Sequence, residues 1–273
     1  SQAAKKDPAI ADALSKAGVS YKQSSLVRYS YLGSNTLNSG NGTWAEGFGA
    51  IDPEFVTDVS DGSMVKFTIG GNECYGITFG SWKGGIALMY VDAVSLKPVG
   101  PDGAELDAPA DTVEGAYGTL VGGGYGAAYE VSQIIYNKNT GYYYLFVSMG
   151  DLNNDYRVGM GRSKDVTGPY IDAGGKNMKF DKPWLSADFH AVGSKIIGAY
   201  QLKNELGWRC QGGQSIMRTD DGKIIFACHS RTNFQPGYYF YLQIHQMFFT
   251  SDGWPVLNMN EYYNDYDGKD EQL

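Results

Sequence analysis

From Ile51 onward, the apolar positions of this chain fall in short runs that turn signals separate. Runs of this length that are rich in valine, isoleucine, tyrosine and phenylalanine predict β-strands. The turn signals are DG at 61–62, NTG at 139–141, DDG at 220–222 and SDG at 251–253. The predicted strands are 64–69, 74–80, 85–91, 131–136, 142–148, 156–161, 194–200, 214–218, 223–229 and 239–249.

Three of these predicted strands resemble one another and form a loose internal repeat. YGITFGS, YYYLFVS and IIFACHS begin at residues 75, 142 and 224, and each ends in a small or polar residue. Repetition of a four-stranded unit favours a β-propeller, whose blades take roughly 40–50 residues before insertions. A β-sandwich with long loops is the alternative on pattern alone.

The first fifty residues have a different pattern. Asp7 is a candidate N-cap, Pro8 suits the first helical position and Gly18 is a stop signal, so we expect a helix over 7–17. A polar, glycine-rich loop is expected over 33–49. The predicted organisation is an N-terminal helix and connecting segment over 1–50, propeller blades over 51–260 and an acidic tail over 261–273.

Composition supports an all-β class. The 273 residues include 37 glycines and 21 tyrosines, which is typical of tight turns and aromatic-rich sheets. The net charge of -8 argues against a nucleic-acid partner, and no apolar run approaches the roughly 18 residues of a membrane span. The three cysteines are too few and too scattered for a disulfide scaffold or a metal-binding Cys pair.

Several strings resemble family 43 of the glycoside hydrolases, in its arabinanase-like branch. They are AIDPEF (50–55), YGITFGSWKGGIALMYVD (75–92), GYYYLFVS (141–148), YRVGMGRSKDVTGPYIDAGGKNM (156–178), GQSIMRTDDGKIIFACHSR (213–231) and LQIHQMFFTSDGWPV (242–256). The resemblance covers about residues 50 to 256. It implies a five-bladed β-propeller, of which about three blades are visible here, and inverting hydrolysis of α-linked arabinose or xylose-type sugars.

The resemblance also implies site residues. Glu130, which precedes an apolar strand and the tyrosine run, matches the general acid, and Asp52 of the IDP string matches the aspartate that tunes its pKa. His229 matches a histidine that binds calcium or its waters. Trp82 and Arg231 are expected to bind substrate. Without the resemblance, Glu130 reads as a surface residue, Asp52 as a turn residue and His229 as a core histidine.

The chemistry explains why two carboxyl groups are wanted. Inverting cleavage needs a proton donor and a base roughly 6.5–9.5 Å apart. The donor must be protonated near neutral pH, and burial together with a neighbouring carboxylate raises its pKa. If Asp52 and Glu130 each lead into a blade, both are expected at the central channel.

The catalytic base is the part of the pattern that the sequence leaves open. Asp7, in DPAI at 7–10, matches the family's base string by letters, but a helical pattern follows it. We therefore expect the base from an N-terminal polypeptide that supplies two further blades. The expected activity is that of an endo-1,5-α-L-arabinanase, in an extracellular, periplasmic or cell-surface location. The alternatives are a non-catalytic carbohydrate-binding propeller, or an arabinofuranosidase or xylosidase of the same family.

Overall fold

The computed structural model describes residues 51–82, 84–106, 118–181, 191–233 and 239–262. The expected helix over 7–17, the glycine-rich loop and the tail from 263 lie outside these residues. In the described part of the chain, no helix has the length and apolar character that crossing a membrane requires.

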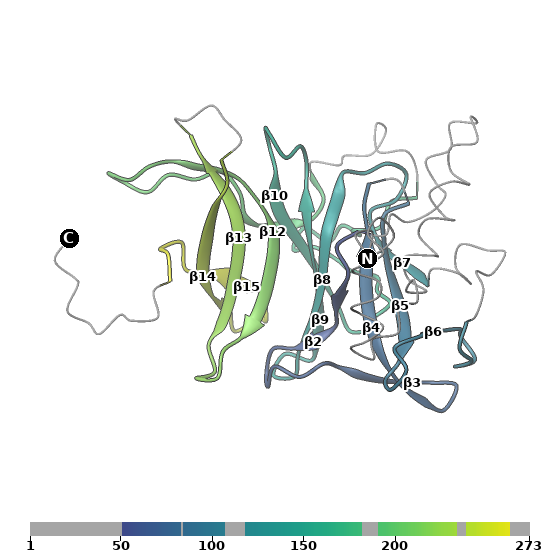
Figure 1. Cartoon of the computed structure of the whole chain (residues 1–273). Coiled ribbons are helices and arrows are strands. Elements are labelled where there is room, and N and C mark those ends of the chain that lie inside the picture. The colour runs from purple at the N-terminus through teal and green to yellow at the C-terminus, as the bar shows by residue number, and fades with distance from the viewer. Residues whose placement is uncertain (1–50, 83, 107–117, 182–190, 234–238, 263–273) are drawn as a thin grey trace, which may run out of the picture.

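The described residues form three β-sheets that follow one another along the chain and stand side by side (Figure 1). The prediction of an all-β propeller fold with about three blades is confirmed. The first sheet has the order β1-β4-β5-β6, with β3 on β4 and β7 on β5. Its strands are β1 (Glu54–Phe55), β3 (Lys66–Ile69), β4 (Asn72–Gly80), β5 (Ile86–Asp92), β6 (Pro98–Val99) and β7 (Thr119–Gly122).

The second and third sheets are each built on a four-stranded antiparallel meander, and the second has a fifth strand. The second runs β8 (Tyr129–Asn137), β9 (Tyr142–Met149), β10 (Arg157–Ser163) and β11 (Ser194–Ile197), and β2 (Thr57–Asp58) joins β8 in parallel. The third runs β12 (Trp208–Arg218), β13 (Ile224–Thr232), β14 (Tyr241–Phe249) and β15 (Pro255–Leu257). The three repeated strings are therefore the second strands β4, β9 and β13 of three successive sheets.

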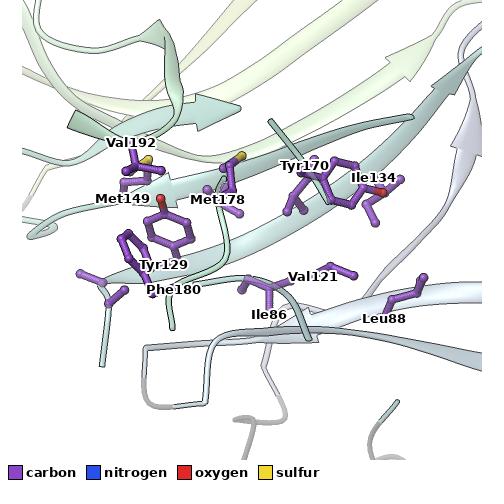
Figure 2. Close-up of a cluster of buried hydrophobic side chains, with 14 of the residues drawn as sticks. Ile86, Leu88, Val121, Tyr129, Ile134, Met149, Tyr170, Met178, Phe180 and Val192 are labelled. Carbon is purple, nitrogen blue, oxygen red and sulfur yellow. The ribbon is translucent and has the colours of Figure 1, made fainter. Parts of the chain in front are cut away.

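A core lies between the first and second sheets. Fully buried side chains from both meet there, including Ile86 and Leu88 of β5 and Ile134 of β8. Figure 2 shows Tyr129, Phe180, Met149, Met178, Tyr170 and Val192 in the same cluster. The rings of Tyr129 and Phe180 meet edge to face at 5.8 Å, a favoured aromatic arrangement.

A second core joins the second and third sheets. It contains Phe146 and Val158 from one side and Ile216, Phe226 and Met247 from the other. Burial of this apolar surface holds the two sheets together, at roughly 25 cal/mol per Å² removed from water. Site residues on both sheets are thereby placed on one rigid frame.

Hydrogen bonds also tie strands of neighbouring sheets. The buried amide of Gln133 on β8 makes two bonds to the backbone of Ile216 on β12. The hydroxyl of Thr78 on β4 donates to the Ser132 carbonyl on β8 at 3.2 Å. The strands β4, β8 and β12 therefore lie next to one another, and residues far apart in sequence meet where these strands begin or end.

Candidate active site

Asp52 and Glu130 lie at the entry to their sheets, close enough to interact electrostatically. Asp52 directly precedes the β1 region, and Glu130 is the second residue of β8. The pKa of Asp52 is raised, first because the carboxyl is half-buried and then because Glu130 lies close enough to repel its charge. The backbone N–H of Val131 donates to the Asp52 carboxylate and opposes that shift. The structure thus brings together the two acids that the sequence separates by most of one sheet.

An irregular backbone at the start of β8 creates this contact. The register with β9 shifts between Glu130 and Gln133, which marks a bulge. Val131, within the bulge, has φ 49°, a left-handed conformation that a β-branched residue rarely adopts. Its carbonyl accepts a hydrogen bond from the Gln214 amide of β12. Such strain persists only where the surroundings fix it, and it clusters at functional sites.

The carboxylate of Glu130 has two hydroxyl partners. The Tyr156 hydroxyl donates to its Oε1 at 2.6 Å, and the Ser81 hydroxyl donates to its Oε2 at 3.3 Å. The backbone N–H of Trp82 donates to the Tyr129 carbonyl at 2.8 Å, which anchors the turn after β4 beside Glu130. The Oε2 atom of Glu130 is thus bound by a residue that follows the first sheet's β4, and its Oε1 atom by a residue of its own sheet region.

His229 of β13 lies next to Tyr156, the partner of Glu130. Its ring stacks on Tyr156 with centroids 5.8 Å apart and planes 8° apart, and meets Phe240 edge to face at 4.7 Å. The pKa of His229 is lowered, chiefly by burial and then by the Arg231 charge, while Glu130 raises it. The imidazole is therefore held neutral near pH 7, and its buried Nδ1 has no hydrogen-bond partner among the described residues.

His229 is the residue at which calcium is predicted. An orphaned imidazole nitrogen is compatible with a bound water or an ion. Calcium, however, prefers six to eight oxygen ligands. Within the described ranges, no group of three or more His, Cys, Asp or Glu side chains could hold a metal ion. Calcium at His229 stays a prediction, and nothing in the proposed chemistry depends on it.

The two predicted substrate-binding residues differ in exposure. Trp82 is 42% exposed and has φ 43°, a left-handed turn conformation. Arg231 is only 4% exposed, and its guanidinium lies 4.2 Å from the centroid of the Phe240 ring. Phe240, which is 44% exposed, therefore covers Arg231. Sugar binding by Trp82 and Arg231 stays a prediction.

Sequence reasoning missed the residues that surround Glu130. From the sequence, Tyr156 is expected only as part of a strand, and Ser81, Ser148 and Phe240 have no expected role at the site. Ser148 lies opposite Glu130 in the β8–β9 register, so period-2 alternation could have found it. Tyr156 and Phe240 come from loops next to strands, and no spacing rule pairs such residues with a carboxylate.

A separate hollow of about 610 Å³ lies at the opposite end of β9 and β10. The guanidinium of Arg162 there lies 4.4 Å from the Tyr142 ring centroid and 4.0 Å from that of Trp254, and its Nη1 donates to the Asp252 carbonyl. The ammonium of Lys164 lies 3.5 Å from the Tyr142 ring. The aromatic rings of this hollow are thus engaged by cations of the chain itself, and the coupled acids lie elsewhere.

Solved structures with a similar fold include family 43 glycoside hydrolases. The YxiA protein of Bacillus licheniformis matches with a TM-score of 0.60 and 26% identity, over 78% of this chain and 44% of that one. The endo-1,5-α-L-arabinanase of Thermotoga petrophila matches with a TM-score of 0.59 and 28% identity, over 79% of this chain and 43% of that one.

Curated relatives agree with these structures. The extracellular endo-α-(1→5)-L-arabinanase of Thermotoga petrophila is 29% identical over 191 residues, 66% of this chain and 37% of the relative. The extracellular endo-α-(1→5)-L-arabinanase 2 of Bacillus subtilis is 28% identical over 198 residues, 68% of this chain and 39% of the relative. The chain therefore spans well under half the length of these two relatives. The family model for glycosyl hydrolases family 43 matches residues 102–255, more than half of the chain. This chain belongs to family 43 of the glycosyl hydrolases.

Proposed function

We propose that this chain carries the acid side of an inverting glycosidase that cleaves α-1,5-linked arabinan. Glu130 donates the proton to the leaving oxygen, and Asp52, the acid that interacts with it electrostatically, helps to orient it. The observation that carries the proposal is the electrostatic interaction of two partly buried carboxyl groups at the entry of β1 and β8. Inverting glycosidases use a pair of carboxyl groups that flank the scissile bond, one of which donates the proton to the leaving oxygen.

The substrate class follows from the relatives. Two relatives of this chain are named endo-arabinanases, and ArbA of Cellvibrio japonicus, 26% identical over 78% of this chain, is named an exo-α-(1→5)-L-arabinofuranosidase. Both names concern α-1,5-linked arabinofuranose, and we assign the same linkage here. Because the named relatives are extracellular, we also assign the protein to the cell exterior. Exo action is the second candidate, since ArbA covers the larger share of this chain.

The base is proposed to come from outside the described residues. Asp7 lies outside them, and the family resemblance supports a base in a first blade. One face of the third sheet packs in the second core through Ile216, Phe226, Cys228 and Met247. The opposite face exposes Met217, Leu242, Phe248 and Val256, at 57%, 68%, 46% and 43%. An apolar sheet face of this kind suits a further sheet.

This uncovered face can be tested by itself. A dye that fluoresces on apolar surfaces is expected to bind the chain, and to bind less to the double variant Leu242→Lys, Phe248→Lys. Circular dichroism would confirm that the variant keeps its strands. Equal dye binding by both proteins would show that this face is not the open one, and would remove the support for a neighbouring sheet.

The glycosidase proposal is tested with arabino-oligosaccharides, with and without sodium azide. Azide replaces a base-activated water: its nitrogen attacks C1, the C1–O bond breaks, and the Glu130 proton goes to the leaving oxygen. Where the base is absent, we expect azide-dependent cleavage and a β-arabinosyl azide product by mass spectrometry and NMR. Glu130→Gln should abolish this product, because an amide cannot donate the proton in place of the acid.

The control is Glu73→Gln, which removes the same charge from an exposed residue paired with Lys66. It should leave cleavage unchanged. Cleavage without azide, lost in Glu130→Gln, would show a complete hydrolase. Oligosaccharide binding without cleavage under either condition would instead establish a carbohydrate-binding propeller and overturn the enzymatic assignment.

A further inference from the structure

Tyr156 is held in place by three neighbouring elements. Its side chain is 2% exposed, its ring stacks on His229, and its hydroxyl lies 2.6 Å from Oε1 of Glu130. Gly212 of β12 makes room for the ring, because a Cβ there would lie 2.0 Å from Cε1 of Tyr156. The phenol therefore has little freedom to turn away from the carboxylate.

The direction of the hydrogen bond follows from the neighbouring hydroxyl. Ser148 also lies next to the phenol, but its own proton goes to Oε1 of Gln214 at 2.7 Å. Its oxygen accepts the backbone N–H of Gly213 at 2.9 Å. The Tyr156 proton is thus directed to Glu130. Burial and the Glu130 charge raise the pKa of the phenol well above its ordinary value, so it stays a donor at all working pH values.

The two oxygens of Glu130 consequently have different surroundings. Oε1 receives a short hydrogen bond from the Tyr156 hydroxyl, whose proton is directed at it, whereas Oε2 faces the Ser81 hydroxyl at the longer distance of 3.3 Å. A proton on Oε1 would face the phenol proton. A proton on Oε2 meets a hydroxyl that can turn to accept it, and the Ser81 contact is long enough to be exchanged for a substrate oxygen.

We propose that Tyr156 is the positioning residue of the general acid: it fixes the Glu130 carboxyl by donating to Oε1 and so reserves Oε2 as the oxygen that delivers the proton. This inference rests on the proposed function. During cleavage the Oε2–H bond breaks, the proton passes to the glycosidic oxygen, and the C1–O electron pair stays with the leaving group. Negative charge then grows on Glu130, and the Tyr156 hydrogen bond strengthens as it does.

The first test compares leaving groups in the full chain, with azide present throughout. Tyr156→Phe keeps the ring and its stack on His229 but removes the donor. We expect cleavage of an aryl arabinoside with a poor leaving group to fall about 10²-fold, the usual loss for one donor to a developing charge. A dinitrophenyl leaving group needs no proton, so its cleavage should change little. Tyr143→Phe, which removes a half-buried phenol from the same sheet, should affect neither.

The second test needs no turnover. A short hydrogen bond from a phenol to a carboxylate gives a downfield hydroxyl proton resonance in the NMR spectrum. That resonance should vanish in Tyr156→Phe, persist in Tyr143→Phe and move upfield in Glu130→Gln, since a neutral amide is a weaker acceptor. A resonance that Glu130→Gln leaves unmoved, or an equal loss of rate for both leaving groups, would overturn the proposal. If no substrate is cleaved, the enzymatic assignment fails, while the NMR outcome still decides whether Tyr156 holds Glu130.

Discussion

The amide of Gln133 makes two of the hydrogen bonds that link the second and third sheets. Its side chain is 3% exposed, its Nε2 donates to the Ile216 carbonyl at 2.9 Å, and its Oε1 accepts the Ile216 N–H at 2.8 Å. The substitution Gln133→Met keeps the length and approximate volume of the side chain and removes both bonds. It leaves one backbone donor and one acceptor of β12 buried without their partner.

The expected loss of stability follows from those two groups. Each buried polar group left unsatisfied costs about 1–3 kcal/mol. The methionine recovers part of this through apolar contacts, so we expect the free energy of unfolding to fall by about 2–4 kcal/mol. Domains are typically stable by about 5–15 kcal/mol, and the loss is therefore a large share of the total.

Urea unfolding followed by circular dichroism measures this loss. With an m-value of about 3 kcal/mol per M, the midpoint should fall by roughly 1 M with no change in m. The control is Gln201→Met, because the Gln201 amide makes an exposed bond to the Glu205 carbonyl that water can replace. The control should stay within about 0.5 kcal/mol of the parent. If both variants lose the same small amount, the amide link does not stabilise the sheet pair and the reasoning is wrong.

Three further substitutions probe other parts of the frame. Tyr144→Phe removes a buried hydroxyl that donates at 2.6 Å to a backbone carbonyl of the β14–β15 turn. The free energy of unfolding, measured in urea, should fall by about 1–3 kcal/mol. A loss below measurement error would show that this hydrogen bond does not stabilise the fold. Gly213→Ala places a methyl group 2.6 Å from Cδ2 of His229 at φ 61°, and should lower the unfolding midpoint by a similar energy; an unchanged thermal midpoint would contradict the predicted clash. Burial and the charge of Glu130 raise the pKa of the Asp52 carboxyl above its ordinary value of 3.8. The parent protein therefore loses stability as pH rises from 3.8 through the pKa of the folded state, and Asp52→Asn removes this loss. The difference in unfolding free energy between the Asn variant and the parent should therefore favour the variant more at about pH 7 than at about pH 3. A difference that favours the variant only at acid pH would refute the raised pKa of Asp52.

Much of the architecture could be predicted because it depends on local patterns. Strands β4, β9 and β13 follow alternation and turn chemistry that any reader of the sequence can find. Their bounds shifted by only a few residues, although β12 begins at Trp208, six residues before the predicted start. The bulge between Arg209 and Gly212, with Cys210 at φ 57°, interrupts the alternation there and hid the first half of that strand.

The details of the candidate site depend on contacts that sequence does not encode locally. Nothing in AAYEVSQ indicates that Val131 adopts a left-handed conformation, because β-branched residues are poor candidates for it. The partnership of Tyr156 with Glu130 depends on that bulge and on the missing side chain of Gly212 from another sheet. Long-range packing decided both, and only coordinates reveal them.

The short stretch from β1 to β2 connects two separate sheets. Glu54 and Phe55 pair with β4 of the first sheet, and two residues later Thr57 and Asp58 pair with β8 of the second. Asp52 therefore lies at the start of a segment, residues 54–58, that pairs with its own sheet and with the sheet that carries the proposed proton donor. Movement of one sheet relative to the other would have to break these backbone pairings, so the spacing of the two acids is fixed before a ligand binds.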